Sequence, residues 1–116
     1  MPKTVLYGIS NCDTVRAARK WLTANGIDFS FHDFRKDGLD EKQLKCWVRE
    51  LGWETLLNKR GMMWRKLPDK QKENLDEKKA IAIMLAEPAI IKRPLLDTGK
   101  KRHVGFSEGE YKQLFK

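Results

Sequence analysis

The chain has 116 residues, of which 41% are hydrophobic and 34% are charged, and its formal net charge is +8. A chain of this length can bury an apolar core without disulfides or metal, and its composition argues against intrinsic disorder. We therefore expect one globular domain over residues 1–116.

The charge and the hydropathy also narrow the class of protein. No segment approaches the roughly 20 apolar residues of a membrane span, and the N-terminal residues lack an apolar run of signal-peptide length, so we expect a cytoplasmic protein without membrane contact. Basic residues are interleaved with acidic ones, and only Lys100, Lys101 and Arg102 form an uninterrupted triple. This distribution favours solvated faces and an anionic small-molecule site over a nucleic-acid surface.

The first third of the chain has the pattern of a strand, a helix and a second strand. Residues 4–7 are a β-rich run that ends at Gly8. The following helix has an apolar face formed by Val15, Ala18, Trp21 and Leu22. Asn25-Gly26 is a typical helix stop, and the next residues alternate, with Ile27, Phe29 and Phe31 on one side. This spacing predicts a βαβ unit with parallel strands.

The middle of the chain is predominantly helical. Residues 39–57 predict a helix with Leu44, Trp47, Val48 and Leu51 on one face, interrupted by Gly52 before a second, shorter helix. Residues 58–74 are polar and basic and indicate an irregular or weakly helical connection. Residues 76–86 predict a strong helix that ends at Glu87-Pro88 and buries Ala80, Ile81, Met84 and Leu85.

The end of the chain predicts two more strands and a closing helix. Residues 95–97 and 102–104 flank a turn and indicate an antiparallel hairpin. Ser107 and Glu110 have capping-box spacing before a helix with Tyr111, Leu114 and Phe115 on its apolar face. The order predicts an α/β protein with a mixed four-stranded sheet, flanking helices and a helical insert after the second strand. This order is thioredoxin-like, although other four-stranded α/β topologies fit it as well.

Cys12 is the main candidate for chemistry, because it follows a strand and begins a helix. Unpaired N–H groups and the helix dipole favour a thiolate there, and a basic neighbour such as Arg16 adds to that effect. Asp13 opposes it unless its carboxylate turns outward. Position alone leaves an ordinary cysteine in a turn as an equal alternative.

The remaining polar residues carry weaker indications. Cys46 lies opposite the apolar helix face and is expected to be incidental; no C-x-x-C pair or zinc-type spacing is present, so we expect no metal and no structural disulfide. Arg60, Arg65 and Arg93 could bind oxyanions or carboxylates, with a solvated basic loop as the alternative for the first two. Surface or core positions are expected for the other candidates, which are His32, His103, Trp47, Trp53 and Trp64.

Three motifs in register resemble the arsenate reductase/Spx superfamily, and most closely its YffB subgroup. They are YGISNCDTVR at residues 7–16, Asn58-Lys59-Arg60 and Ile91-Lys92-Arg93-Pro94, and the match extends to residues 104–106. The resemblance implies a thioredoxin-like fold with a helical insert and a nucleophilic cysteine at Cys12. It also implies glutathione as co-substrate, glutaredoxin as a possible partner, and no tightly bound cofactor.

The resemblance extends to the residues around the cysteine. It implies that Arg60 and Arg93 hold the substrate oxyanion and that the Arg93–Pro94 peptide is cis, and Arg60 could also bind a glutathione carboxylate. Asn11 and Pro94 would contribute to binding of substrate or glutathione, and Arg16 would stabilise the thiolate.

The sequence also departs from the superfamily at three places. Arsenate reductases have a histidine at the position of Gly8 and a further arginine before the final helix, where this chain has residues 104–107, VGFS. Val15 occupies the position of the second cysteine of Spx-type redox switches. We therefore expect a glutathione-linked thiol oxidoreductase. The alternatives are an arsenate reductase proper, a non-enzymatic Spx-like module that binds RNA polymerase and, as the weakest, a nucleic-acid binder.

Overall fold

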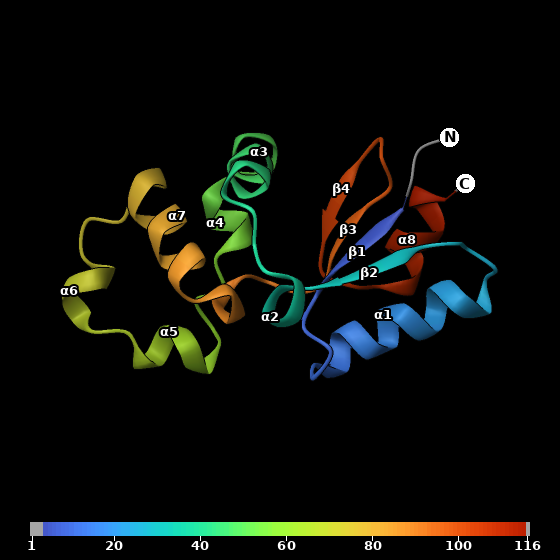
Figure 1. Cartoon of the computed structure of the whole chain (residues 1–116), viewed down its shortest axis with the longest axis horizontal. Coiled ribbons are helices and arrows are strands. Elements are labelled where there is room, and N and C mark those ends of the chain that lie inside the picture. The colour runs from blue at the N-terminus through green and yellow to red at the C-terminus, as the bar shows by residue number, and fades with distance from the viewer. Residues whose placement is uncertain (1–3, 116) are drawn as a thin grey trace. The chain divides into compact units, whose positions relative to one another are not determined.

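The computed structural model describes residues 4–115, which form two compact units (Figure 1). We call residues 4–37 and 93–115 the sheet unit and residues 38–92 the helical unit. Each unit has buried hydrophobic residues of its own, and the single domain expected over residues 1–116 stays a prediction. Within the described part of the chain, every helix is too short or too polar to cross a membrane.

The sheet unit contains a mixed four-stranded sheet, as predicted. Its strands are β1 (Val5–Gly8), β2 (Ser30–Asp33), β3 (Leu95–Asp97) and β4 (Arg102–Val104), in the order β2-β1-β3-β4. β1 is parallel to β2 and antiparallel to β3, and β3 and β4 form the expected antiparallel hairpin. This confirms the thioredoxin-like arrangement of a βαβ unit followed by a hairpin.

The second strand begins later than the alternating pattern indicates. Ile27 and Phe29 precede β2 and pack against the core of the sheet unit instead. The reason lies at the helix end: Gly26 has a φ of +68°, and the Ile27 N–H still donates to the Leu22 carbonyl at 3.0 Å. The chain therefore becomes extended only after this turn is complete.

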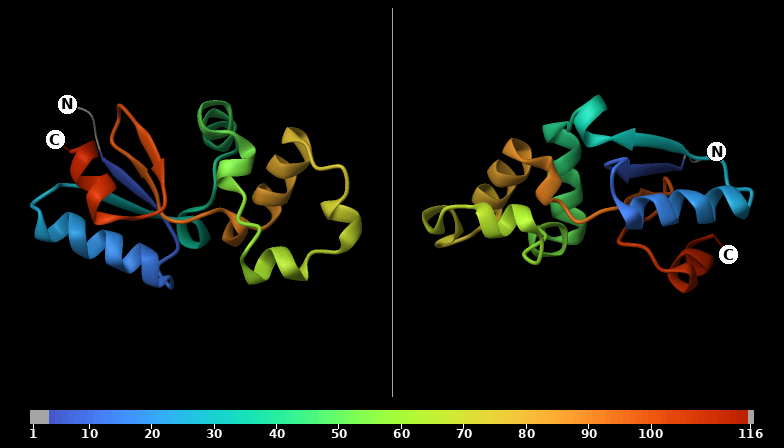
Figure 2. Two further views of the ribbon diagram at one scale, coloured as in Figure 1. Left: turned by 180° about the vertical axis from the view of Figure 1, so that it is seen from behind. Right: turned by 90° about the horizontal axis from the view of Figure 1, so that it is seen from below.

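Helices α1 (Asp13–Ala24) and α8 (Glu108–Leu114) cover the same face of the sheet, as the right-hand view of Figure 2 shows. The core between these layers consists of fully buried side chains, namely Leu6, Ala18, Leu22, Leu96 and Tyr111. Burying one leucine of this kind is worth about 1.5–3 kcal/mol. α8 begins where expected, because the Ser107 Oγ accepts the Glu110 N–H at 3.2 Å.

The helical unit is the predicted insert between β2 and β3. After the short helix α2 (Phe34–Asp37) of the sheet unit come α3 (Glu41–Leu51), α4 (Trp53–Leu56), α5 (Met62–Lys66), α6 (Asp69–Lys72), α7 (Glu77–Ala86) and the 3-10 helix η1 (Pro88–Ile90). Gly52, with a φ of +89°, separates α3 from α4 as predicted. Hydrogen bonds from the Asn58 N–H to the Ile90 carbonyl, 2.9 Å, and from the Lys92 N–H to the Leu56 carbonyl, 2.7 Å, join the segment after α4 to the segment after η1.

The buried face of α7 differs from the predicted one. Ala80 and Met84 are buried as expected, but the third buried residue is Ile83, while Ile81 and Leu85 are partly exposed. Because α7 is apolar around most of its circumference, periodicity could not identify which stripe faces the rest of the unit. The packing of the helical unit decides it.

Candidate active site at one end of the sheet

Three chain segments meet at one end of the sheet. β1 and β2 are parallel, so their carboxyl ends coincide, and Gly8 pairs with Asp33 there. β3 runs antiparallel to β1 and starts at the same end, because Leu95 pairs with Tyr7. Open α/β sheets bind ligands outside the carboxyl ends of parallel strands. The loop with Cys12, which follows β1, and the Arg93–Pro94 segment, which precedes β3, therefore belong to the end where a site is expected.

Cys12 is the N-cap residue of α1, as the sequence predicts. Its backbone is extended, with φ −149° and ψ 124°, and its carbonyl accepts the Arg16 N–H at 2.9 Å. The side chain is partly exposed and caps no backbone N–H of the helix. Asn11 and Asp13 on either side are exposed. Cys12 is thus partly exposed at a helix end whose dipole favours negative charge.

Arg16 forms an ion pair with Asp13. Its Nη2 lies 2.9 Å from the Asp13 Oδ1, and the two side chains are 58% and 99% exposed. The Asp13 carboxylate therefore points outward. It pairs with the Arg16 guanidinium, the group that we expect to stabilise the Cys12 thiolate. Ion pairs this exposed are worth at most about 1 kcal/mol, so another anion could replace the carboxylate. The role of Arg16 stays a prediction.

The place of the missing histidine is filled by Val15. A Cβ added to Gly8 would lie 2.8 Å from the Val15 Cγ2, closer than real side-chain carbons come. A side chain at position 8 therefore requires Val15 to move. Gly8 replaces the histidine expected from arsenate reductases, and Val15 replaces the second cysteine expected from Spx-type switches. Because the two residues pack against each other, these two departures from the superfamily are physically linked.

Asp33, which the sequence analysis did not select, is a buried carboxylate at this end of the sheet. It is 4% exposed, and its Oδ2 accepts the Ser10 N–H at 3.1 Å. Its Oδ1 accepts the N–H groups of Arg35 and Lys36 at 2.8 and 3.3 Å. Burial by itself raises the pKa of the Asp33 carboxyl, but these hydrogen bonds outweigh it and hold the pKa below its ordinary value. An acidic residue at the carboxyl end of a predicted parallel strand was the available signal.

The Arg93–Pro94 peptide is cis, as the resemblance implies. Pro94 is buried, and its carbonyl accepts the Gly105 N–H at 2.8 Å; Arg93 is partly exposed. The conformation is confirmed, whereas the binding roles of both residues stay predictions.

The other predicted residues belong to the helical unit. Arg60 and Arg65 are exposed residues of the helical unit, and the Arg60 N–H donates to the Asn58 Oδ1 at 3.0 Å. Their anion-binding roles stay predictions. Cys46 is exposed on α3, as expected. In the part of the chain that the structure describes, no group of three or more His, Cys, Asp or Glu residues could hold a metal ion.

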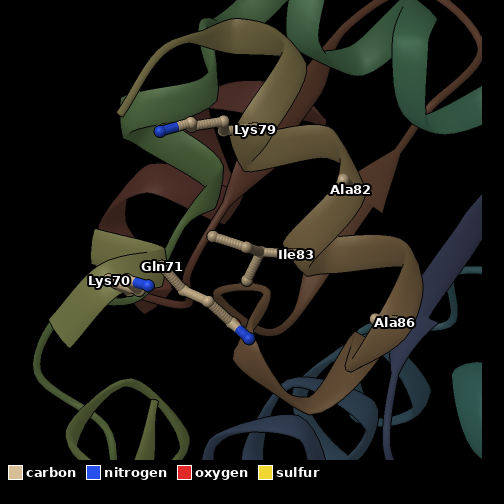
Figure 3. Close-up of a pocket in the computed structure, with 6 residues that line it drawn as sticks. All are labelled: Lys70, Gln71, Lys79, Ala82, Ile83 and Ala86. Atoms are coloured by element: carbon tan, nitrogen blue, oxygen red, sulfur yellow. The ribbon is translucent and has the colours of Figure 1, made fainter. Parts of the chain in front are cut away.

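A pocket in the helical unit contains none of the predicted site residues. Its volume is about 410 Å³, and α7 contributes an apolar wall of Ala82, Ile83 and Ala86 (Figure 3). Lys70 and Gln71 of α6 line the other side. Because its lining contains no cysteine, this pocket is no candidate for the thiol chemistry expected of Cys12.

The parallel β1–β2 pair, the cysteine at the start of the intervening helix and the proline before β3 define a protein of thioredoxin-like fold. The sequence profile of the ArsC family matches residues 7–114, and the chain belongs to this family.

Two solved structures are similar to nearly the whole chain. A solved structure described as YFFB (PA3664) protein is 46% identical, covers 96% of this chain and 97% of its own, and superposes with a TM-score of 0.93. A solution structure of an arsenate reductase related protein from Brucella melitensis is 44% identical over 98% of this chain and 95% of its own, with a TM-score of 0.79.

Two sequence relatives are also similar over most of the chain. An uncharacterized protein of Haemophilus influenzae is 42% identical over 110 residues, 95% of this chain and 96% of its own length. The global transcriptional regulator Spx of Streptococcus pyogenes is 28% identical over 107 residues, 90% of this chain and 79% of its own.

Proposed function

We propose that the protein is a thiol oxidoreductase in which Cys12 is the nucleophile and glutathione is the reductant. The observation that carries the proposal is the position of Cys12, partly exposed at the N-terminus of a 12-residue helix and next to the carboxyl ends of two parallel strands. Membership of the ArsC family and similarity to an arsenate reductase related protein support a thiol reductase.

The proposed reaction consists of two thiol exchange steps. The Cys12 thiolate attacks the glutathione sulfur of a substrate–glutathione mixed disulfide, the substrate thiolate leaves and takes a proton, and a Cys12–glutathione disulfide forms. The thiolate of a second glutathione then attacks this disulfide, which releases oxidised glutathione and restores the Cys12 thiolate. In balance, one mixed disulfide and one glutathione become one substrate thiol and one oxidised glutathione.

The other predicted residues have binding roles in this proposal. Arg16 and Arg93 stabilise the thiolate and the bound anion, and Arg60 binds a glutathione carboxylate or a substrate anion. Asn11 and Pro94 provide polar and backbone contacts to the thiol substrate. Because the reaction needs reduced glutathione, we place the protein in the cytoplasm, where thiols are kept reduced, with glutaredoxin as a possible partner.

The test is turnover of a glutathione mixed disulfide, followed as formation of oxidised glutathione. Cys12→Ser should abolish turnover because the hydroxyl cannot form the intermediate disulfide, whereas Cys46→Ser, the matched control on α3, should retain it. Mass spectrometry of the wild-type protein after reaction with oxidised glutathione should find the adduct on Cys12. Full activity in Cys12→Ser would overturn the proposal.

Arsenate reduction is a second candidate with the same nucleophile. It is disfavoured because Val15 fills the place of a histidine side chain at position 8 and because the segment before α8 has no arginine. Coupled arsenate turnover with glutathione and glutaredoxin would establish it.

A non-enzymatic interaction module is the third candidate. Two observations favour it: the relative named Spx and the ion pair in which Asp13 already engages Arg16. RNA polymerase retained equally by the wild type and by Cys12→Ala, together with alkylation of Cys12 no faster than that of Cys46, would support this function.

A further inference from the structure

We propose that Asp33 is a positioning residue for Cys12, because its buried carboxylate holds the turn that carries the sulfur to the N-terminus of α1. This inference rests on the proposed function, since only a reacting sulfur needs a fixed position.

The carboxylate joins two segments that are distant in sequence. On one side its Oδ2 accepts the N–H of Ser10, which lies two residues before Cys12. On the other side its Oδ1 accepts the N–H groups of Arg35 and Lys36 at the start of α2. The Asp33 N–H in turn donates to the Asp37 Oδ2 at 3.0 Å. Both carboxylate oxygens are thus engaged, so the turn after β1 is tied to the end of β2.

The burial of the Asp33 carboxylate indicates that its hydrogen bonds matter to the fold. A carboxylate removed from water is unfavourable unless hydrogen bonds compensate it. Among the described residues, Asp33 is the one charged residue that is buried. A carboxylate that only capped the start of α2 could do so from a position exposed to solvent. The buried position of Asp33 is explained by the hydrogen bond from the Ser10 N–H, which requires the carboxylate to lie beside the turn after β1.

The turn has few other constraints. Ile9 is buried, but the side chains of Ser10 and Asn11 are exposed and Cys12 is only partly buried. The influence of a helix dipole falls off within the first turn. A small displacement of the turn would therefore move the sulfur away from the helix amides, and the hydrogen bond from the Ser10 N–H to the Asp33 carboxylate opposes that displacement.

The experiment compares the alkylation rates of Cys12 and Cys46 by iodoacetamide in the same protein, resolved by mass spectrometry over a range of pH. In Asp33→Asn the rate of Cys12 relative to Cys46 should fall about tenfold at neutral pH, and the pH dependence of this ratio should differ from that of the wild type. Asp28→Asn removes the same charge from an exposed position of the same unit, and should leave the ratio unchanged.

Hydrogen exchange of the Ser10 amide measures the hydrogen bond from Ser10 to Asp33 directly. The Ser10 amide should exchange with solvent faster in Asp33→Asn than in the wild type, while amides in the middle of α1 keep their protection. If Asp33→Asn fails to fold, Asp33→Glu serves instead. It keeps the negative charge but moves the carboxylate oxygens by one methylene, so it should also lower the ratio and speed exchange of the Ser10 amide.

The possible failures are distinguishable. A folded Asp33→Asn with an unchanged ratio and an unchanged pH profile would overturn the positioning role and leave the proposed function standing. An equal fall in Asp28→Asn would also overturn it, because the effect would then be one of net charge. Turnover that survives in Cys12→Ser would instead overturn the proposed function.

Discussion

At Asp33, burial and hydrogen bonding act in opposite directions on one carboxyl group. Burial raises its pKa, and the N–H groups of Ser10, Arg35 and Lys36 lower it further than burial raises it. A group whose pKa is depressed in the folded state stabilises the fold above its unfolded pKa, about 3.9 for aspartate. That contribution is lost as the pH falls through the folded value.

This gives a pH-dependent stability for Asp33→Asn. At neutral pH the variant should lose about 1–3 kcal/mol of unfolding free energy, because the asparagine NH2 group cannot accept and the N–H groups of Ser10, Arg35 and Lys36 lose a charged acceptor. The difference in unfolding free energy between the variant and the wild type should shrink as the pH falls below the unfolded aspartate pKa. The wild type then loses the stabilisation that its ionised carboxylate provides. Urea unfolding at neutral and acidic pH measures both values. Asp28→Asn is the control, and a difference that stays constant across the pH range would contradict the explanation.

At the scale of elements, the close approach of β1 and α1 depends on a glycine opposite a branched side chain. The Val15 Cγ2 occupies the space beside Gly8 in which a Cβ would lie, at 2.8 Å. Val15 itself is fully buried, so it cannot turn into solvent to make room. The two residues therefore behave as one packing unit between a strand end and the first turn of the helix that carries Cys12.

Gly8→Ala should lower the unfolding free energy by about 1–3 kcal/mol through overpacking. Val15→Ala should also be destabilising alone, because it leaves a cavity, but the double variant should cost less than the sum of the two, since the new methyl group enters the space that the valine vacates. Chemical denaturation of the four proteins in the cycle measures the coupling. Additive effects would show that the two positions do not compete for space.

Sequence patterns predicted the elements well where a single physical signal was present. The capping serine of α8, the glycine between α3 and α4 and the hairpin of β3 and β4 all lie where local chemistry indicated. The patterns failed where two signals coincided. The apolar circumference of α7 concealed its buried stripe, and the turn at Gly26 delayed β2 beyond the first alternating residues.

At the scale of the whole molecule, the order of elements predicted the sheet topology, because short connections and parallel βαβ pairing leave few arrangements. The cysteine position and the cis peptide were also predicted, the latter only through the family resemblance. Asp33 was not, since its importance depends on a contact with Ser10, 23 positions away, that only the folded sheet brings about. The two compact units are not marked in the sequence, because composition does not change at residues 38 or 92, and the single domain over residues 1–116 stays a prediction.

The two units raise the question of whether the chain unfolds in one step. Met84 on α7 and Leu22 on α1 are both fully buried, one in the helical unit and one in the sheet unit. Replacing either with alanine should cost about 2–5 kcal/mol. We expect Met84→Ala to reduce amide protection chiefly in residues 38–92 and to leave the alkylation rate of Cys12 unchanged, because each unit has its own buried residues. Leu22→Ala should give the reverse pattern in hydrogen exchange. Equal loss of protection in both units, with either variant, would contradict this expectation and support the single cooperative domain that composition and length predict.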